Sequence, residues 1–148
     1  MNASELKTLI DDYAEQLNAI PEAEFYEKPL PQKWSKKEIV GHLIDSAQNN
    51  IRRFIVAQYE DTPTIVYNQD KWVALSNYQN MESKLVIQLW YLLNKQIVSI
   101  LENITDEAAQ RTSKSEEVHT IQWLAEDYTR HLKHHIHLGL QLEPVPYP

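Results

Sequence analysis

Four of the six histidines in this chain fall within the stretch D-Y-T-R-H-L-K-H-H-I-H-L-G-L, residues 127–140. Neutral imidazole is the commonest metal ligand among protein side chains, so such a cluster could hold a divalent cation. Imidazole also titrates near neutral pH, so the cluster could instead form a pH-sensitive patch on an ordinary helix. Which of these holds depends on the helix face that each histidine occupies.

Two of these histidines lie on the apolar side of the helix that the stretch predicts. His131 and His135 take positions that a packed helix normally gives to Leu or Ile, whereas His134 lies on the flank and His137 points mostly away. The residues of this side are Ile121, Leu124, Tyr128, His131, His135 and Leu138. Burying an imidazole costs free energy unless it finds a partner. The pair therefore predicts either a shared divalent ion or two core histidines bonded to side chains or water.

Asp127 lies one helical turn before His131, where its carboxylate could orient the imidazole ring of a metal ligand. The same carboxylate could equally remain solvated beside Arg130. A metal site also requires a third ligand from elsewhere in the chain. Only His42 and His119 remain, and His119, which precedes the expected start of the last helix, is predicted to lie in a loop.

His42 lies in the segment W-S-K-K-E-I-V-G-H-L-I-D-S-A-Q-N-N-I-R-R-F, residues 34–54, which predicts another helix. The side that carries His42 lies roughly 150° from the apolar stripe, as an ordinary solvent face would. A polar pocket open to water would give the same pattern, so spacing leaves both interpretations open. The polar residues on this side are His42, Asp45, Ser46, Asn49 and Arg53.

The elements that must position these side chains are four long segments with helical apolar periodicity. They are expected at about residues 3–20, 35–59, 81–103 and 121–141, with short helices at 70–75 and 106–110. Ser35 with Glu38, and Asn2 with Glu5, have the spacing of a helix cap and its reciprocal partner, and Thr120 is a further expected cap. No convincing strand pattern is present, and the proline-rich tail is expected to be extended.

These elements predict an all-α fold, an up-and-down four-helix bundle in a single domain over residues 1–148. The connection 61–80 is long for a hairpin, so it predicts a crossing linker that carries a short helix. The net charge of −7 argues against duplex nucleic acid or an anionic membrane as a partner. Since no apolar run approaches the roughly 20 residues of a membrane span, a cytoplasmic protein is expected. The absence of cysteine excludes a thiol nucleophile or thiolate ligand from within this sequence.

Taken together, three segments resemble the DinB-like superfamily, most closely its YfiT-like branch. They are W-S-K-K-E-I-V-G-H-L, P-T-I-V-Y-N-Q-D-K-W and R-H-L-K-H-H-I-H, in the order of the family and spanning about residues 29–140. The resemblance implies a divalent metal held by three histidines, which match His42, His131 and His135. It also implies that the His42 side of its helix lines a pocket.

The family is described as metal-dependent hydrolases, and some members transfer low-molecular-weight thiols such as bacillithiol onto electrophiles. Three neutral imidazoles leave positions open on the ion, which could activate water or hold an incoming thiol as thiolate. The expected cofactor is one Zn²⁺ or Ni²⁺ ion. The expected partners are a small-molecule substrate and, for thiol transfer, a thiol cosubstrate.

Neighbouring residues are candidates for the remaining roles in such a site. Asp45 and Asn49 could accept a proton or position the substrate, and Arg53 could bind an anionic group. Gln69 and Trp72 of the crossing linker could wall the pocket. Each of the five could equally be solvated or structural, and a packing role is expected for Trp34, Trp90 and Trp123.

Other functional classes remain open at this level. A non-catalytic binding module would keep the bundle and lack the chemistry, and it is favoured by the scarcity of a recognisable general base beside the histidines. A pH sensor built on the histidine cluster would respond near pH 6. Bundles of this type often pair through exposed helix faces, so a homodimer is a further expectation.

Overall fold

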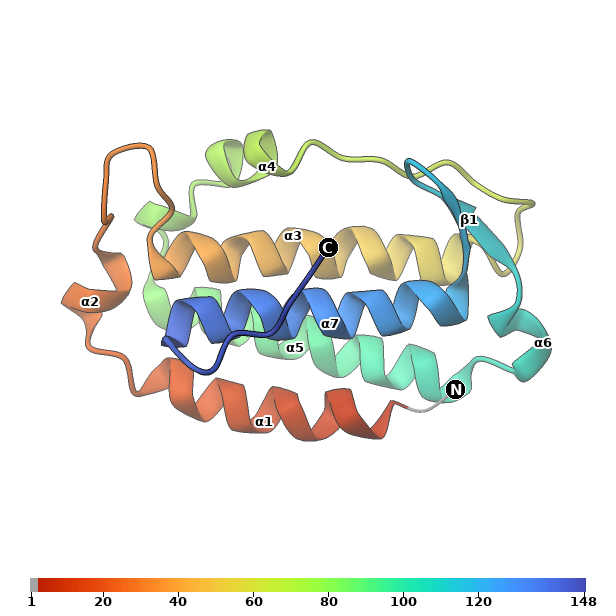
Figure 1. Ribbon diagram of the computed structural model, residues 1–148, viewed down its shortest axis with the longest axis horizontal. Coiled ribbons are helices and arrows are strands. Elements are labelled where there is room, and N and C mark those ends of the chain that lie inside the picture. Colours follow the sequence, from red (N-terminus) through yellow and green to blue (C-terminus); the bar gives the residue numbers. More distant parts are fainter. Residues whose placement is uncertain (1–2) are drawn as a thin grey trace.

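The computed structural model describes residues 3–148, and the long helices of this part form a bundle (Figure 1). The long helices are α1 (Ser4–Asn18), α3 (Lys36–Val56), α5 (Ser83–Asn103) and α7 (Ile121–Leu140). The shorter ones are α2 (Glu22–Tyr26), α4 (Gln69–Ser76), the 3₁₀ helix η1 (Tyr78–Asn80) and α6 (Asp106–Ala109). The predicted four-helix bundle with a crossing linker is confirmed, and its long helices end within a few residues of the expected bounds. The expected cap Asn2 lies outside the described residues.

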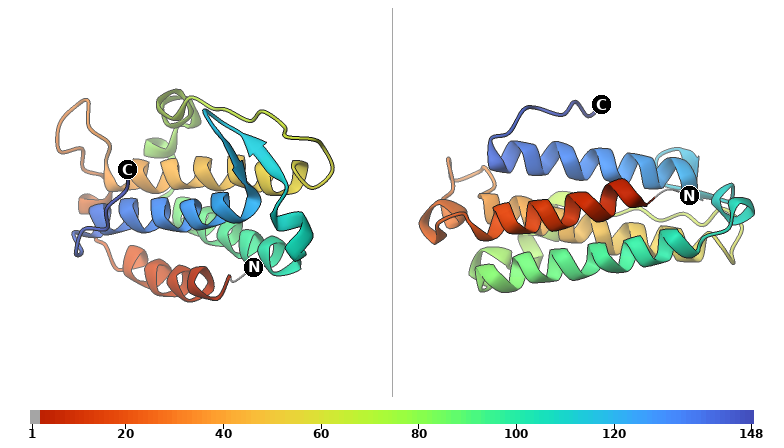
Figure 2. Two further views of the ribbon diagram at one scale, coloured as in Figure 1. Left: turned by 45° about the vertical axis from the view of Figure 1, so that its right-hand side comes forward. Right: turned by 90° about the horizontal axis from the view of Figure 1, so that it is seen from below.

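A crossing linker sets the directions of the helices. After α3 ends, the chain runs back along the bundle through α4 before α5 begins (Figures 1 and 2). As a result α3 and α5 run in the same direction, and α1 and α7 run in the opposite one. A bundle connected only by hairpins would alternate instead. The linker therefore lies over a face of α3 that a simple hairpin would leave open.

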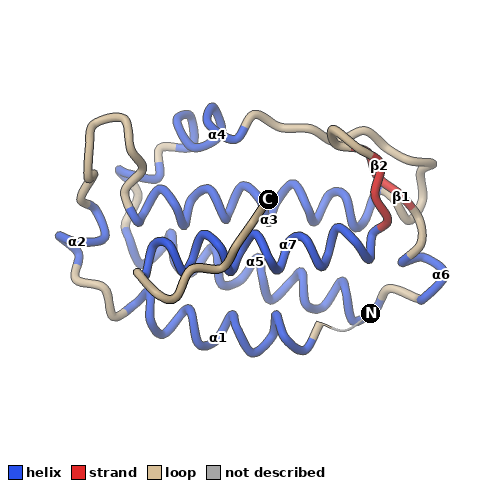
Figure 3. Tube along the Cα trace, viewed as in Figure 1, coloured by secondary structure: helices blue, strands red, loops and turns tan. Residues whose placement is uncertain are grey.

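A small β-hairpin corrects the expectation of a chain without strands. The strands β1 (Thr112–Lys114) and β2 (Val118–Thr120) pair antiparallel beside the start of α7 (Figure 3). His119 therefore lies in β2, not in a loop. Two backbone hydrogen bonds of 2.9 Å also join Lys114 to the linker. The Lys114 N–H donates to the Pro63 carbonyl, and the Ile65 N–H donates to the Lys114 carbonyl. The hairpin thus holds the linker against the bundle.

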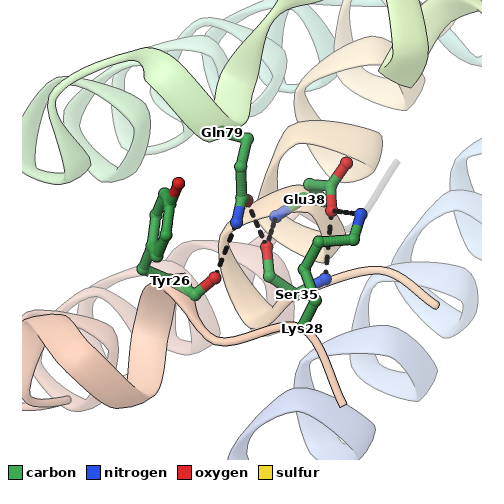
Figure 4. Close-up of polar contacts among 5 residues, drawn as sticks. All are labelled: Tyr26, Lys28, Ser35, Glu38 and Gln79. Carbon is green, nitrogen blue, oxygen red and sulfur yellow. Dashed lines mark hydrogen bonds and ion pairs between the residues drawn. The ribbon is translucent and has the colours of Figure 1, made fainter. Parts of the chain in front are cut away.

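The start of α3 is fixed by its cap and by two neighbouring elements. The Ser35 hydroxyl accepts from the Glu38 N–H at 3.0 Å, and the Glu38 carboxylate accepts from the Ser35 N–H at 3.2 Å, which is the predicted capping box. Ser35 Oγ also donates to Gln79 Oε1, and Gln79 Nε2 donates to the Tyr26 carbonyl, each at 2.6 Å (Figure 4). These bonds tie α3 to α2 and η1, and so fix the position from which His42 is presented.

Burial on α3 extends well beyond its apolar stripe. His42 and Asp45 have no exposed surface, and Asn49 is buried as well. This polar side looked like a solvent face in the sequence, but α7 packs on it at His42 and η1 packs on it at Asp45. Within the described residues, no helix is long and apolar enough to cross a membrane.

Gly41 permits close packing of η1 on α3. A methyl group added at Gly41 would lie 2.5 Å from Cγ and 2.7 Å from Cε2 of the Tyr78 ring, well inside van der Waals contact. The Tyr78 hydroxyl in turn donates to the Asp45 carboxylate. A side chain at position 41 would therefore displace both the ring and this hydrogen bond.

We predict that Gly41→Ala lowers the free energy of unfolding by about 1–2 kcal/mol. Overpacking against Tyr78 outweighs the roughly 1 kcal/mol that alanine gains over glycine inside a helix. Urea unfolding followed by circular dichroism measures the difference. Gly139→Ala in α7 is the matched control, because a methyl group there would meet Ile39 Cγ2 at 3.9 Å, an ordinary contact. The control should be as stable as the wild type or more stable, and equal stability of Gly41→Ala would contradict the described packing.

Candidate metal centre

Imidazoles from α3 and α7 converge on one point of the bundle. His42 Nε2 lies 3.1 Å from His131 Nε2. The ring centroid of His135 lies 4.7 Å from that of His42 and 4.5 Å from that of His131. One ring nitrogen from each of the three lies within 4.8 Å of the others. The residues that the resemblance implied as ligands are therefore neighbours in space.

Burial keeps these rings neutral. Desolvation lowers the pKa of His42 to about 4. It also lowers the pKa of His135 to about 4, with the neighbouring His42 and His134 adding to the shift. For His131, burial and then the nearby His135, His42 and His134 lower the pKa to about 2. A neutral imidazole with a free lone pair is the form that binds a metal.

The donor set fits a divalent cation. Imidazole nitrogens lie about 2.0–2.1 Å from zinc, so small rotations of the rings would bring all three to one ion. His42 Nδ1 is buried and has no hydrogen-bond partner among the described residues. The Trp34 ring packs on the His42 ring instead, with centroids 5.0 Å apart. A cation at Nε2 would offset the cost of burying this imidazole with one nitrogen unpaired.

A buried carboxylate lies one turn further along α3. Asp45 is fully buried and accepts a hydrogen bond from the Tyr78 hydroxyl through Oδ1, while Oδ2 lacks a partner among the described residues. Burial raises the pKa of Asp45 to about 6, and the bond from Tyr78 opposes this shift. Asn49 Nδ2 donates to the Asp45 backbone carbonyl at 2.9 Å, so this amide supports the helix itself.

A polar cavity of about 580 Å³ reaches the centre at His131. Arg53 and Arg130 contribute positive charge to its lining, and Glu116, Glu117 and Asp127 contribute negative charge.

Arg53 is held in place by its Nη2, which donates to the Ile65 carbonyl at 2.9 Å, and by its Nη1, which donates to Asn50 Oδ1 at 3.3 Å. Of the residues proposed to meet substrate, Arg53 and Gln69 line this cavity. Trp72 lies beside it, with its ring edge-on to Tyr67 at 5.8 Å.

The C-terminal segment covers part of this cavity. The tail is extended, as predicted, and runs back across α7 (Figure 1). His134 Nδ1 and His137 Nδ1 lie 2.7 Å from the backbone carbonyls of Val145 and Glu143, to which the ring N–H groups donate. The Tyr147 ring lies edge-on to His131, with centroids 5.2 Å apart.

The partner of Asp127 differs from the expected one. Its Oδ2 accepts a hydrogen bond from the Tyr147 hydroxyl at 2.7 Å, and no bond to the His131 ring is present among the described residues. Asp127 and His131 line the same cavity, but spacing on the helix could not reveal that the tail reaches the Asp127 carboxylate. A tail without periodicity carries no sequence signal for such a contact.

The tryptophans divide between core and cavities. Trp90 is fully buried in the core, as expected. Trp34 is half-buried against His42, and Trp123 is 40% exposed and stacks on His119 in the polar cavity, with centroids 3.4 Å apart. Trp34 and Trp123 thus pack on histidine rings, as a packing role implies, but they do so in cavity walls and not in the apolar core.

Comparison with known proteins gives a consistent picture. Residues 5–138 match the DinB superfamily. A provisionally named metal-dependent hydrolase of Oceanobacillus iheyensis is 23% identical over 139 residues, covering 87% of this chain and 80% of its own. YfiT of Bacillus subtilis, also provisionally named a metal-dependent hydrolase, is 27% identical over 107 residues, covering 70% of this chain and 60% of its own.

Solved structures share the fold. That of Bacillus subtilis YfiT, described as a probable metal-dependent hydrolase with an unusual four-helix bundle topology, superposes with a TM-score of 0.78 at 22% identity, over 93% of this chain and 83% of that one. A mycothiol-dependent maleylpyruvate isomerase superposes with a TM-score of 0.74 at 17% identity, over 99% of this chain and 65% of that one. Both likenesses concern the arrangement of the helices.

We predict that Asp45→Asn stabilises the metal-free protein at pH 8 by roughly 1–3 kcal/mol. Burial raises the folded-state pKa of Asp45 from 3.8 to about 6. The protonated carboxyl therefore stabilises the fold fully below pH 3.8, and this contribution is lost as the pH rises to about 6. Asparagine removes the buried charge and keeps an acceptor for Tyr78. Urea unfolding at pH 8 and pH 4.5 should show a gain that shrinks at the lower pH. Asp12→Asn, an exposed control in α1, should show no such dependence; a loss of stability at pH 8 in Asp45→Asn would contradict the assignment.

Proposed function

Because the chain belongs to the DinB superfamily, we propose that it is a metal-dependent enzyme that acts on a small molecule at its three-histidine centre. The reaction is hydrolysis or the transfer of a low-molecular-weight thiol to an electrophile. The observation that carries this proposal is the convergence of three neutral imidazoles from two helices at the edge of a polar cavity.

In this proposal His42, His131 and His135 hold one divalent ion, zinc or nickel. Such an ion supplies Lewis acidity, which lowers the pKa of a water or thiol bound to it. The burial that depresses the imidazole pKa values keeps the rings free of protons at neutral pH, so protons do not compete with the cation.

Arg53 and Arg130 give the substrate an electrostatic anchor. Both line the polar cavity beside His131, and an anionic group would meet them there. Because Arg53 is already tied to the Ile65 carbonyl, its guanidinium is oriented before a ligand arrives. Asp45 and Asn49, the other candidates on this side, do not line the polar cavity, and they bond to Tyr78 and to the helix backbone, so we assign them a positioning role.

Two observations bear on the choice between hydrolysis and thiol transfer. The relatives from Oceanobacillus iheyensis and Bacillus subtilis carry names that support hydrolysis. The isomerase with the same fold uses mycothiol, and this chain has no cysteine, so a transferred thiol would be a cosubstrate. A screen of thiols with reactive electrophiles, and of ester and amide substrates, separates the two when run with and without a chelator. Absence of chelator-sensitive turnover throughout would favour a non-catalytic binding module.

We predict that the purified protein binds about one equivalent of Zn²⁺ or Ni²⁺ and that His131→Ala abolishes this uptake. Removal of one of three ligands leaves two imidazoles, too few to hold the ion, while the hydrophobic core of the bundle, to which His131 does not belong, stays intact. Calorimetric titration of the metal-free protein gives the stoichiometry, and circular dichroism reports helical content.

His119→Ala is the matched control, because His119 lies in β2 within the same cavity but outside the converging triad. The control should retain uptake. Uptake by His131→Ala at the wild-type level would refute the proposed centre.

A further inference from the structure

A second cavity, which is more apolar than the first, also reaches the three-histidine centre. It has a volume of about 980 Å³ and touches the centre at His135, whereas the polar cavity touches it at His131. Gln69 of the linker lines both cavities, so the two meet at the same place in the bundle. The centre therefore has two approaches.

The cavity at His135 is largely apolar. Its wall includes Trp34, Leu30, Ile39 and Leu138. Leu138 is 62% exposed and Leu30 is 50% exposed, so this surface is open to a ligand in the free protein. Exposed aliphatic side chains gathered around a concave site gain free energy when a ligand covers them.

Charges at the rim do not dominate this cavity. Lys36 pairs with Glu24 at 2.6 Å, which neutralises one charge of each sign, and Lys33, Glu27 and Asp70 supply the rest. The polar cavity holds the anchored Arg53 together with Arg130, and Glu116, Glu117 and Asp127 lie in the same lining. An anionic group therefore has an oriented partner in Arg53 on the His131 side, and an uncharged apolar group has aliphatic partners on the His135 side.

We propose that the apolar cavity binds an aryl or alkyl group of the molecule that reacts at the three-histidine centre. This inference rests on the proposed function and narrows its substrate class to molecules that carry an apolar group beside the reacting atom. The ring of Trp34, packed on His42, forms the wall where this group meets the centre.

The cavity itself is tested on metal-free protein with benzyl alcohol as the probe. Methyl NMR spectra should show saturable shifts at Leu30, Ile39 and Leu138, because these methyl groups line the cavity. Leu92 of α5, which is 55% exposed, is an internal reference that should not move. Absence of shifts at the three lining residues overturns the proposal, whether or not the protein binds a metal.

The link to the centre is tested on zinc-loaded protein with acetohydroxamate and benzohydroxamate, which share a metal-binding group and differ in the ring. We expect the preference for benzohydroxamate to fall by about tenfold in Leu138→Lys, since a charge replaces part of the apolar wall. The intrinsic affinities for zinc cancel when the ratio is compared between variants. Leu92→Lys, a matched change of an exposed leucine on α5, should keep the wild-type ratio.

The outcomes distinguish failure of the proposed metal-dependent function from failure of the proposed apolar subsite. Failure to take up zinc overturns the proposed function, while the benzyl alcohol shifts still decide the apolar subsite. An unchanged hydroxamate ratio in Leu138→Lys overturns the subsite even when zinc binds. Sedimentation at several protein concentrations tests whether a second copy of the chain occupies the apolar cavity. A dimer that dissociates in Leu138→Lys would also overturn the ligand assignment.

Discussion

The structure depends on the burial of three neutral imidazoles between two helices. Removing an imidazole from water disfavours its charged form, and the proximity of the rings strengthens this effect, most of all at His131. Because His42 Nδ1 has no hydrogen-bond partner among the described residues, the cluster is costly to bury without a shared ion. The surrounding elements hold the three rings in one geometry, in which a shared ion could offset this free energy.

The crossing linker is what makes that geometry available. By returning the chain along the bundle it covers the polar side of α3, and it brings η1 and Tyr78 against Gly41 and Asp45. The hairpin holds the linker at Ile65, whose carbonyl in turn fixes Arg53. A polar helix face that would otherwise meet solvent becomes an interior wall, with cavities of different character at its two ends.

The sequence predicted the helices well because their signals are local. Ser35 and Thr120 cap their helices as expected, and the step pattern placed His131 and His135 on the packed side of α7. The position of His42 could not be derived from spacing, since the elements that bury its side lie far away in the chain. Strands of three residues are too short to show alternation, which is why the hairpin was missed. The contacts of Tyr147 and the role of Trp34 likewise depend on tertiary packing alone.

The C-terminal segment shows how a short tail can hold its place without a helix or strand of its own. Its bonds to the side chains of α7 come from Glu143, Val145 and Tyr147, every second residue, and prolines occupy the positions between and after them. Successive residues of an extended chain face opposite sides, so one edge of the tail meets α7 while the other carries pyrrolidine rings. Each ring fixes a backbone dihedral in advance and removes an amide donor from the chain. The tail is therefore stiffened before it docks, and it gives up little chain entropy when it does.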